Sequence, residues 1–98
     1  MKKAQDSNVQ LNTLLISLFD EMTRKRQDIL EDMADDAVII MQLRGNRKFN
    51  AWAKEIASDE DPQHPRVYVE FALKPKIAPL LSKSLSWDQV EAMELQPA

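Results

Sequence analysis

The only histidine of the chain lies in an acidic loop, where it could act as a general base or bind a metal ion. His64 follows three acidic residues at positions 59–61 and stands directly before Pro65. An imidazole beside carboxylates can transfer protons near neutral pH. A conventional zinc site would need a second histidine or cysteines, and the sequence contains neither. We therefore expect His64 to be an exposed loop residue without a catalytic role.

Carboxylates also cluster just before the middle of the chain. They are Asp28, Glu31, Asp32, Asp35 and Asp36. Oxygen-rich clusters can bind Mg²⁺ or Ca²⁺, but the segment lacks the spacing and the loop glycine of an EF-hand. We expect a solvated helix face and no metal. The single glycine of the chain, Gly45, also excludes a glycine-rich phosphate loop. The sequence accordingly predicts a protein that is not an enzyme and that needs no cofactor.

Basic side chains gather in one segment of this otherwise acidic chain. They are Arg44, Arg47, Lys48 and Lys54, interleaved with Phe49 and Trp52. Basic residues beside aromatic ones can hold phosphates and stack nucleic-acid bases. The helical spacing of the aromatic residues instead favours core positions, with the basic residues on a solvated face. Neighbouring acidic residues would repel phosphates, which weakens the case for nucleic acid. Contact of these four residues with nucleic acid or with an acidic protein is therefore an alternative hypothesis.

The composition is that of a folded protein. Its 98 residues predict a single domain over 1–98, with 44% hydrophobic residues, 30% charged residues and a net charge of −3. The lack of cysteine excludes disulfides and fits a reducing compartment. We find no cleavable secretory signal and no apolar stretch of the roughly 18 residues that a membrane helix needs. The sequence predicts a cytoplasmic protein without membrane contact.

A long amphipathic helix is the first element that would position these residues. Residues 7–10 fit a capping box, and apolar residues at helical spacing extend the predicted helix to about Met33. The main members of its apolar stripe are Leu11, Leu15, Leu18, Met22 and Ile29. Such a helix would span about 40 Å, whereas a compact domain of this size has a diameter of roughly 33 Å. Either the helix breaks near residues 24–27, or a second copy or another protein covers part of the stripe.

Four shorter elements are predicted after this helix. Three successive β-branched residues favour a strand over a helix at residues 37–43, and Gly45 marks a turn. Residues 48–57 predict an amphipathic helix, with Ile56 on its inner face beside Phe49, Trp52 and Ala53. Strict alternation at 66–73 predicts a half-buried strand. A helical turn at 77–81 is an option, and a second capping box at 86–89 predicts a last helix over 87–95.

The predicted fold class is therefore α+β and helix-dominated, with a long N-terminal helix, two short strands and two short helices. An all-α fold is the alternative if residues 37–43 are helical. If both strands form, the helix at 48–57 can connect them as parallel neighbours. Two strands alone make a marginal sheet, so they would need cover from helices or additional strands.

The stretch from Asp28 to Ile40, followed by Gly45 and the helix through Trp52, resembles the opening of NTF2-like cone domains. In that family, paired helices lead into a strand that begins Asp-Asp-x-Val and then into another helix. The resemblance implies a strand at 37–43 and a small ligand-binding pocket. It also implies several long strands afterwards, for which only residues 66–73 qualify, so we assign no family.

The preferred functional interpretation is a small protein–protein interaction or adaptor protein. We expect it to form a homodimer, or to bind another protein, through Leu11, Leu15, Leu18, Met22 and Ile29. Each leucine or isoleucine that is fully buried contributes on the order of 1.5–3 kcal/mol, so this set could hold a dimer together. The alternatives are a nucleic-acid-binding regulator that uses the basic segment and a small ligand-binding domain of the cone type.

Overall fold

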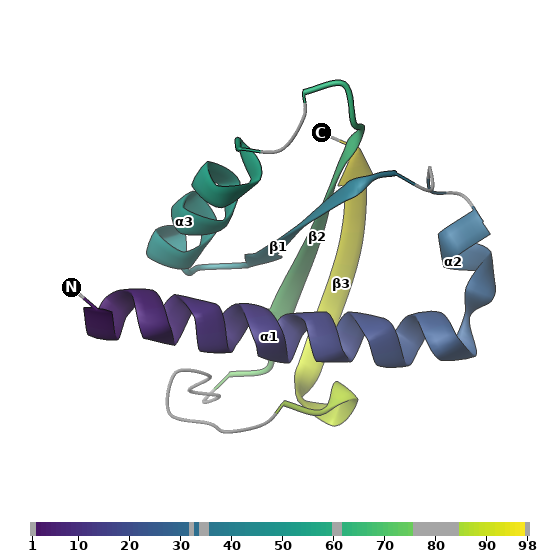
Figure 1. The fold of residues 1–98 in the computed structure, drawn as a ribbon. Helices are drawn as coiled ribbons and strands as arrows, with labels where there is room; N and C mark the ends of the chain where they lie inside the picture. Colours follow the sequence, from purple (N-terminus) through teal and green to yellow (C-terminus); the bar gives the residue numbers. More distant parts are fainter. Residues whose placement is uncertain (1, 32, 34–35, 60–61, 76–84, 98) are drawn as a thin grey trace.

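A three-stranded sheet and a long helix organise the chain (Figure 1). The computed structural model describes residues 2–31, 33, 36–59, 62–75 and 85–97. Its elements are α1 (Lys2–Lys25), α2 (Gln27–Glu31), β1 (Val38–Leu43), α3 (Arg47–Ala57), β2 (Arg66–Leu73), the 3-10 helix η2 (Trp87–Gln89) and β3 (Val90–Pro97). The predicted α+β class with a long N-terminal helix is confirmed. The helical turn considered at 77–81 lies outside the described residues.

The sheet has the strand order β1-β2-β3. β1 and β2 are parallel, with Met41 opposite Val69, and α3 forms the crossover between them. β3 runs antiparallel to β2 and places Leu95 opposite Val69. Both predicted strands and their parallel arrangement are therefore confirmed. The third strand was not predicted, and it supplies the additional pairing that a two-stranded sheet requires.

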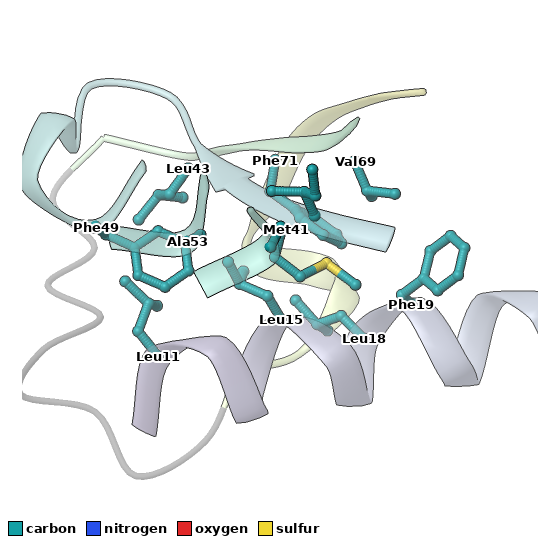
Figure 2. Packing of buried hydrophobic residues seen from close by; sticks show 12 residues of the cluster. Leu11, Leu15, Leu18, Phe19, Met41, Leu43, Phe49, Ala53, Val69 and Phe71 are labelled. Carbon is teal, nitrogen blue, oxygen red and sulfur yellow. The ribbon is translucent and has the colours of Figure 1, made fainter. Parts of the chain in front are cut away.

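One face of the sheet carries most of the core. Side chains alternate between the faces of a strand, and residues opposite one another share a face. The face that includes Met41, Val69 and Phe71 meets α1, whose Leu15 and Leu18 point toward it (Figure 2). All of these five side chains are at most 3% exposed. The indole N–H of Trp87 closes this layer by donating to the Leu18 carbonyl over 2.9 Å.

The N-terminal helix is shorter than predicted at its end and longer at its start. α1 begins at Lys2, so Ser7 lies inside the helix and the predicted capping box at 7–10 is wrong. The helix ends at Lys25, and α2 starts after Arg26, which confirms the predicted break near 24–27. The last turn contains Arg24 and Lys25, which suit the negative end of the helix dipole. The next residues are polar and exposed, so no apolar contact extends the helix along the sheet.

The apolar stripe of α1 is covered by the chain itself. Leu11, Leu15 and Leu18 are 1%, 0% and 1% exposed within a single copy. They could contact a second copy only by leaving this core, so their assignment to an interface is corrected. The length mismatch that suggested an interface disappears for two reasons. The helix breaks at Arg26, and the third strand widens the sheet beneath it.

The predicted last helix over 87–95 is wrong. The contact of the capping residue Gln89 does form, because the Ser86 N–H donates to Oε1 of Gln89 over 2.9 Å. The Gln89 N–H donates to the Ser86 carbonyl over 3.0 Å, which is the backbone bond of a 3-10 turn. They support only the 3-10 helix Trp87–Gln89. Beyond it, Val90 pairs with Leu73 and the chain continues as β3. Burial against β2 overrides the local helix signal.

The crossover helix α3, Arg47–Ala57, confirms the helix predicted over 48–57. Phe49 and Ala53 are buried, whereas Ile56 is 49% exposed, so the predicted inward orientation of Ile56 is wrong. Gly45 adopts φ +88° in the preceding turn, a conformation that side chains with a Cβ rarely take. Asn46 then caps the helix by accepting from the Phe49 N–H over 3.1 Å.

A side-chain amide closes the edge of β1. Oδ1 of Asn50 accepts from the Leu43 N–H over 2.7 Å, and its Nδ2 donates to the Leu43 carbonyl over 2.9 Å. This pair of bonds has the pattern that a neighbouring strand would provide. α3 therefore satisfies the end of β1 and blocks it from pairing with another chain.

Replacing Leu15 with alanine should lower the free energy of unfolding by about 2–5 kcal/mol, because it leaves a cavity in the α1–sheet core. Chemical denaturation followed by circular dichroism measures this loss. The matched control is the next residue, Ile16, which is 39% exposed. Its change to alanine should cost less than about 1 kcal/mol. Equal losses for the two variants would contradict the described burial of α1.

Replacing Asn50 with alanine should cost about 1–3 kcal/mol, because it removes both bonds to Leu43 and leaves the Leu43 N–H without its partner, while the Leu43 carbonyl still accepts from the Asn46 N–H. Denaturant midpoints compared with wild type give the loss. Lys48→Ala, an exposed change in the same helix, should stay within about 0.5 kcal/mol of wild type. Stability of Asn50→Ala equal to that of the Lys48 control would show that the edge contact is not needed.

Candidate functional site

The predicted basic segment does not form a free cationic patch. Nη2 of Arg44 lies 3.1 Å from Oε1 of Glu70 and 3.7 Å from Oε1 of Glu94, so one guanidinium serves two carboxylates. Nζ of Lys54 lies 5.4 Å from the ring centroid of Tyr68, a cation–π distance. Arg47 and Lys48 are exposed in the first turn of α3. The four residues thus divide between ion pairing, aromatic contact and solvent.

The aromatic residues of this segment are in the core rather than available for stacking. Phe49 is 0% exposed, and its ring centroid lies 5.8 Å from that of the half-buried Trp52. A base could not stack on Phe49 without displacing α3. This result supports the core interpretation of the aromatic spacing and weakens the nucleic-acid alternative.

The predicted titratable clusters lie only partly within the described residues. Within the described residues, no group of three or more histidine and acidic side chains could hold a metal ion. His64 is half-buried rather than fully exposed, and its backbone carbonyl accepts from Nη1 of Arg66 over 3.0 Å. Asp32 and Asp35 lie outside the described residues, and so do residues 60–61 of the acidic loop.

An apolar cleft opens where α1 stops covering the sheet. Its volume is about 500 Å³. Its lining residues are Arg26, Asp28, Ile29, Met33, Val67, Leu95, Gln96 and Pro97. They come from the α1–α2 break, from the start of β2 and from the end of β3. Clefts of this size with a mainly apolar lining and a few polar groups are typical binding sites in proteins.

Ile29 is the predicted interface residue that this cleft does contain. It is half-buried in α2, and Met22, also half-buried, packs against the core. The other cleft residues were missed. Alternation along 66–73 places Val67 on the same face as Val69, which is the face that packs on the core. This signal could have identified Val67 as an apolar residue of the sheet that lies beyond the end of α1. No local signal indicates Leu95, because the segment around it was interpreted as a helix.

An ion pair stands at the rim of the cleft. Nη2 of Arg26 lies 2.9 Å from Oδ2 of Asp28, and Nε lies 3.4 Å from Oδ1. The hydrogen bond from the guanidinium holds the pKa of the Asp28 carboxyl below its ordinary value, and the charge of Arg26 acts in the same direction. Both side chains are exposed. The pair therefore closes the turn between α1 and α2 with little contribution to stability.

The outer edge of β3 adjoins the same cleft. β3 is the last strand of the sheet, and among the described residues only β2 pairs with it (Figure 1). The edge of β1 is capped by Asn50, whereas no such cap of β3 is found in the described part of the chain. β3 carries the exposed Glu91 and Glu94 and no basic residue. The candidate site is therefore an open strand edge beside an apolar cleft.

The cone architecture implied by the resemblance to NTF2-like domains does not form in the described residues. β1 is followed by two strands rather than several, and β1 and β2 are parallel. The cleft also lies away from Trp52, which packs against Phe49 on α3. The hypothesis of a ligand pocket of the cone type therefore has no support in the described residues.

Comparison with known proteins gives one match. Residues 8–84 match DUF5647, which is described as a family of unknown function. This segment includes β1, α3 and β2, whereas β3 lies beyond it. No curated protein and no solved structure matches the chain. Within the described residues, no helix combines the length and the apolar character that crossing a membrane requires.

Titration of Asp28 tests the rim of the cleft. The pKa of its carboxyl should lie below the ordinary value of 3.8, and Arg26→Gln should raise the midpoint toward that value. Because the pKa is lowered in the folded state, the small stabilisation exists above the unfolded pKa and is lost as the pH falls through the folded one. Carboxyl chemical shifts followed by NMR measure the midpoint. Lys25→Gln is the control and should leave it unchanged; an identical midpoint in wild type and Arg26→Gln would contradict the pair.

Proposed function

We propose that this chain, which belongs to the DUF5647 family of unknown function, is a small non-enzymatic interaction protein. Its binding surface is the outer edge of β3 together with the apolar cleft between α2 and the sheet. The observation that carries this proposal is that an apolar cleft meets a strand edge with which no described residue pairs on its outer side. We further propose a cytoplasmic location, for which the lack of cysteine in the chain is the support.

The two parts of this surface suit one mode of recognition. An extended segment that adds to a sheet edge gains affinity from backbone hydrogen bonds, and its alternate side chains enter pockets beside the sheet. At β3, every second side chain of such a segment would face the side on which Leu95 and Val67 line the cleft. The edge would provide backbone pairing and the cleft would provide selectivity.

This surface replaces the one predicted from the helix stripe. Leu11, Leu15 and Leu18 are buried in the core, whereas Ile29 remains partly exposed in the cleft. Self-association and binding to another protein both remain proposals, and both now rest on β3. The nucleic-acid alternative has less support, because Arg44 is ion-paired and Phe49 is buried.

A matched pair of substitutions tests the proposal. Ile29→Lys places a charge in the cleft, and Ile56→Lys makes the same change at a site that is 49% exposed on α3. Burial of one isoleucine at an interface is worth about 1.5–3 kcal/mol, so Ile29→Lys should weaken binding by roughly tenfold or more. Ile56→Lys should leave binding within about twofold of wild type, since exposed substitutions have small effects.

The measurement has two arms. Light scattering over a concentration series detects self-association, and capture on the immobilised chain from a lysate of the source organism, quantified by mass spectrometry, detects other proteins. We expect at least one bound species that wild type and Ile56→Lys retain and Ile29→Lys loses. A monomer at every concentration with no retained protein would refute the interaction function. Equal retention by both variants would refute the cleft as its surface.

A further inference from the structure

We infer that the segment bound at β3 is an extended strand of another protein, in which a basic side chain opposite Glu94 is flanked by apolar ones. The inference rests on the proposed function and deepens it by naming the chemistry of the partner. Two observations carry it. One is the charge on the edge of the sheet, and the other is that Glu94 and its neighbours Met93 and Leu95 lie on opposite faces of β3.

A row of residues across the sheet ends in an unbalanced negative charge. Gln42, Glu70 and Glu94 lie opposite one another on β1, β2 and β3. Glu70 and Glu94 are thus cross-strand neighbours of like charge, an unfavourable pairing. Arg44 contacts both carboxylates, but one guanidinium neutralises only one of them. A strand added outside β3 would place its own side chain next to Glu94 in this row, where a lysine or arginine would balance the second carboxylate.

The other face of β3 selects apolar side chains. Met93 and Leu95 lie on the face that packs on the core, and Leu95 lines the cleft with Ile29 and Val67. Residues of an added strand alternate between the two faces. A basic side chain opposite Glu94 therefore leaves its neighbours in the sequence on the cleft side. The pattern that fits both faces is a basic residue opposite Glu94 with an apolar residue on each side of it.

A second copy of this chain does not meet these requirements. β3 contains Glu91 and Glu94 and no lysine or arginine, so a second β3 strand would bring further carboxylates to an edge where Arg44 already serves both Glu70 and Glu94. Like charges directly opposite one another destabilise a strand pair. Nucleic acid is excluded from this edge by the same carboxylates, which repel phosphates. A basic strand from a different protein is the occupant that the charges favour.

Peptide binding to the full chain tests the inference. The probe is an eight-residue peptide that alternates lysine and valine, and it is added to the ¹⁵N-labelled protein. One comparison peptide has glutamate in place of every lysine. Another keeps lysine and valine but has four consecutive N-methylated amides, which cannot complete a strand ladder on either edge. We expect the lysine peptide to shift the amide resonances of β3 and to bind at least tenfold more tightly than either comparison peptide.

A charge variant of the chain locates the contact. Glu94→Gln should weaken binding of the lysine peptide by about two- to fivefold, the range for one cross-strand charge pair. Glu55→Gln removes an exposed carboxylate from α3 and should leave binding unchanged. Equal binding of the lysine and glutamate peptides, equal binding of the N-methylated peptide, or shifts confined to residues outside β3 and the cleft would each overturn the inference.

The outcomes also separate this inference from the proposed function. Dimerisation of the chain, with shifts at β3 and no response to the lysine peptide, would overturn the basic partner while leaving an interaction function at the same edge. A monomeric chain that neither binds the lysine peptide nor retains a protein from the lysate would overturn both.

Discussion

Burial of the apolar stripe of α1 against one face of the sheet is the contact on which the whole structure depends. A three-stranded sheet exposes an apolar face, and a 24-residue helix with an apolar stripe is only marginally stable in water by itself. Each element supplies the surface that the other lacks. Leu15 of α1 and Phe71 of β2 are both 0% exposed, and they belong to the same core cluster. Sheet and helix must therefore fold as one unit, and the α1–β contacts determine where every other element lies.

The end of this contact defines the surface available for binding. α1 stops at Lys25, before it reaches the row of the sheet that contains Val67, and the uncovered apolar residues form the cleft. The two outer strands differ in whether their outer edge is covered. Asn50 occupies the edge of β1, whereas β3 ends the sheet without such a contact in the described residues. The cleft exists because α1 covers the apolar face of the sheet only in part.

Elements with a local pattern could be predicted, and elements that depend on distant contacts could not. Alternation at 66–73 identifies β2, because apolar and polar side chains of a half-buried strand alternate between its two faces. The capping residues at 86–89 do form their contacts, but the strand that follows depends on pairing with β2, which no local pattern reveals. The same limit applies to Leu15, whose apolar character is visible in the sequence although the surface that covers it is not. Of the cleft, Ile29 could be predicted as partly exposed and apolar, whereas Leu95 reaches it only through the register of the sheet.

The bond between the Trp87 indole and the Leu18 carbonyl joins residues 69 positions apart, and this separation has a consequence for biosynthesis. At roughly 5–20 residues per second, a ribosome needs about 3–14 seconds to pass from one residue to the other. Until Trp87 has been made, the apolar stripe of α1 lacks the last part of its cover. Hydrophobic surface that is exposed in this transient way favours aggregation, so the order of synthesis places the most apolar helix of the chain at risk before its cover exists.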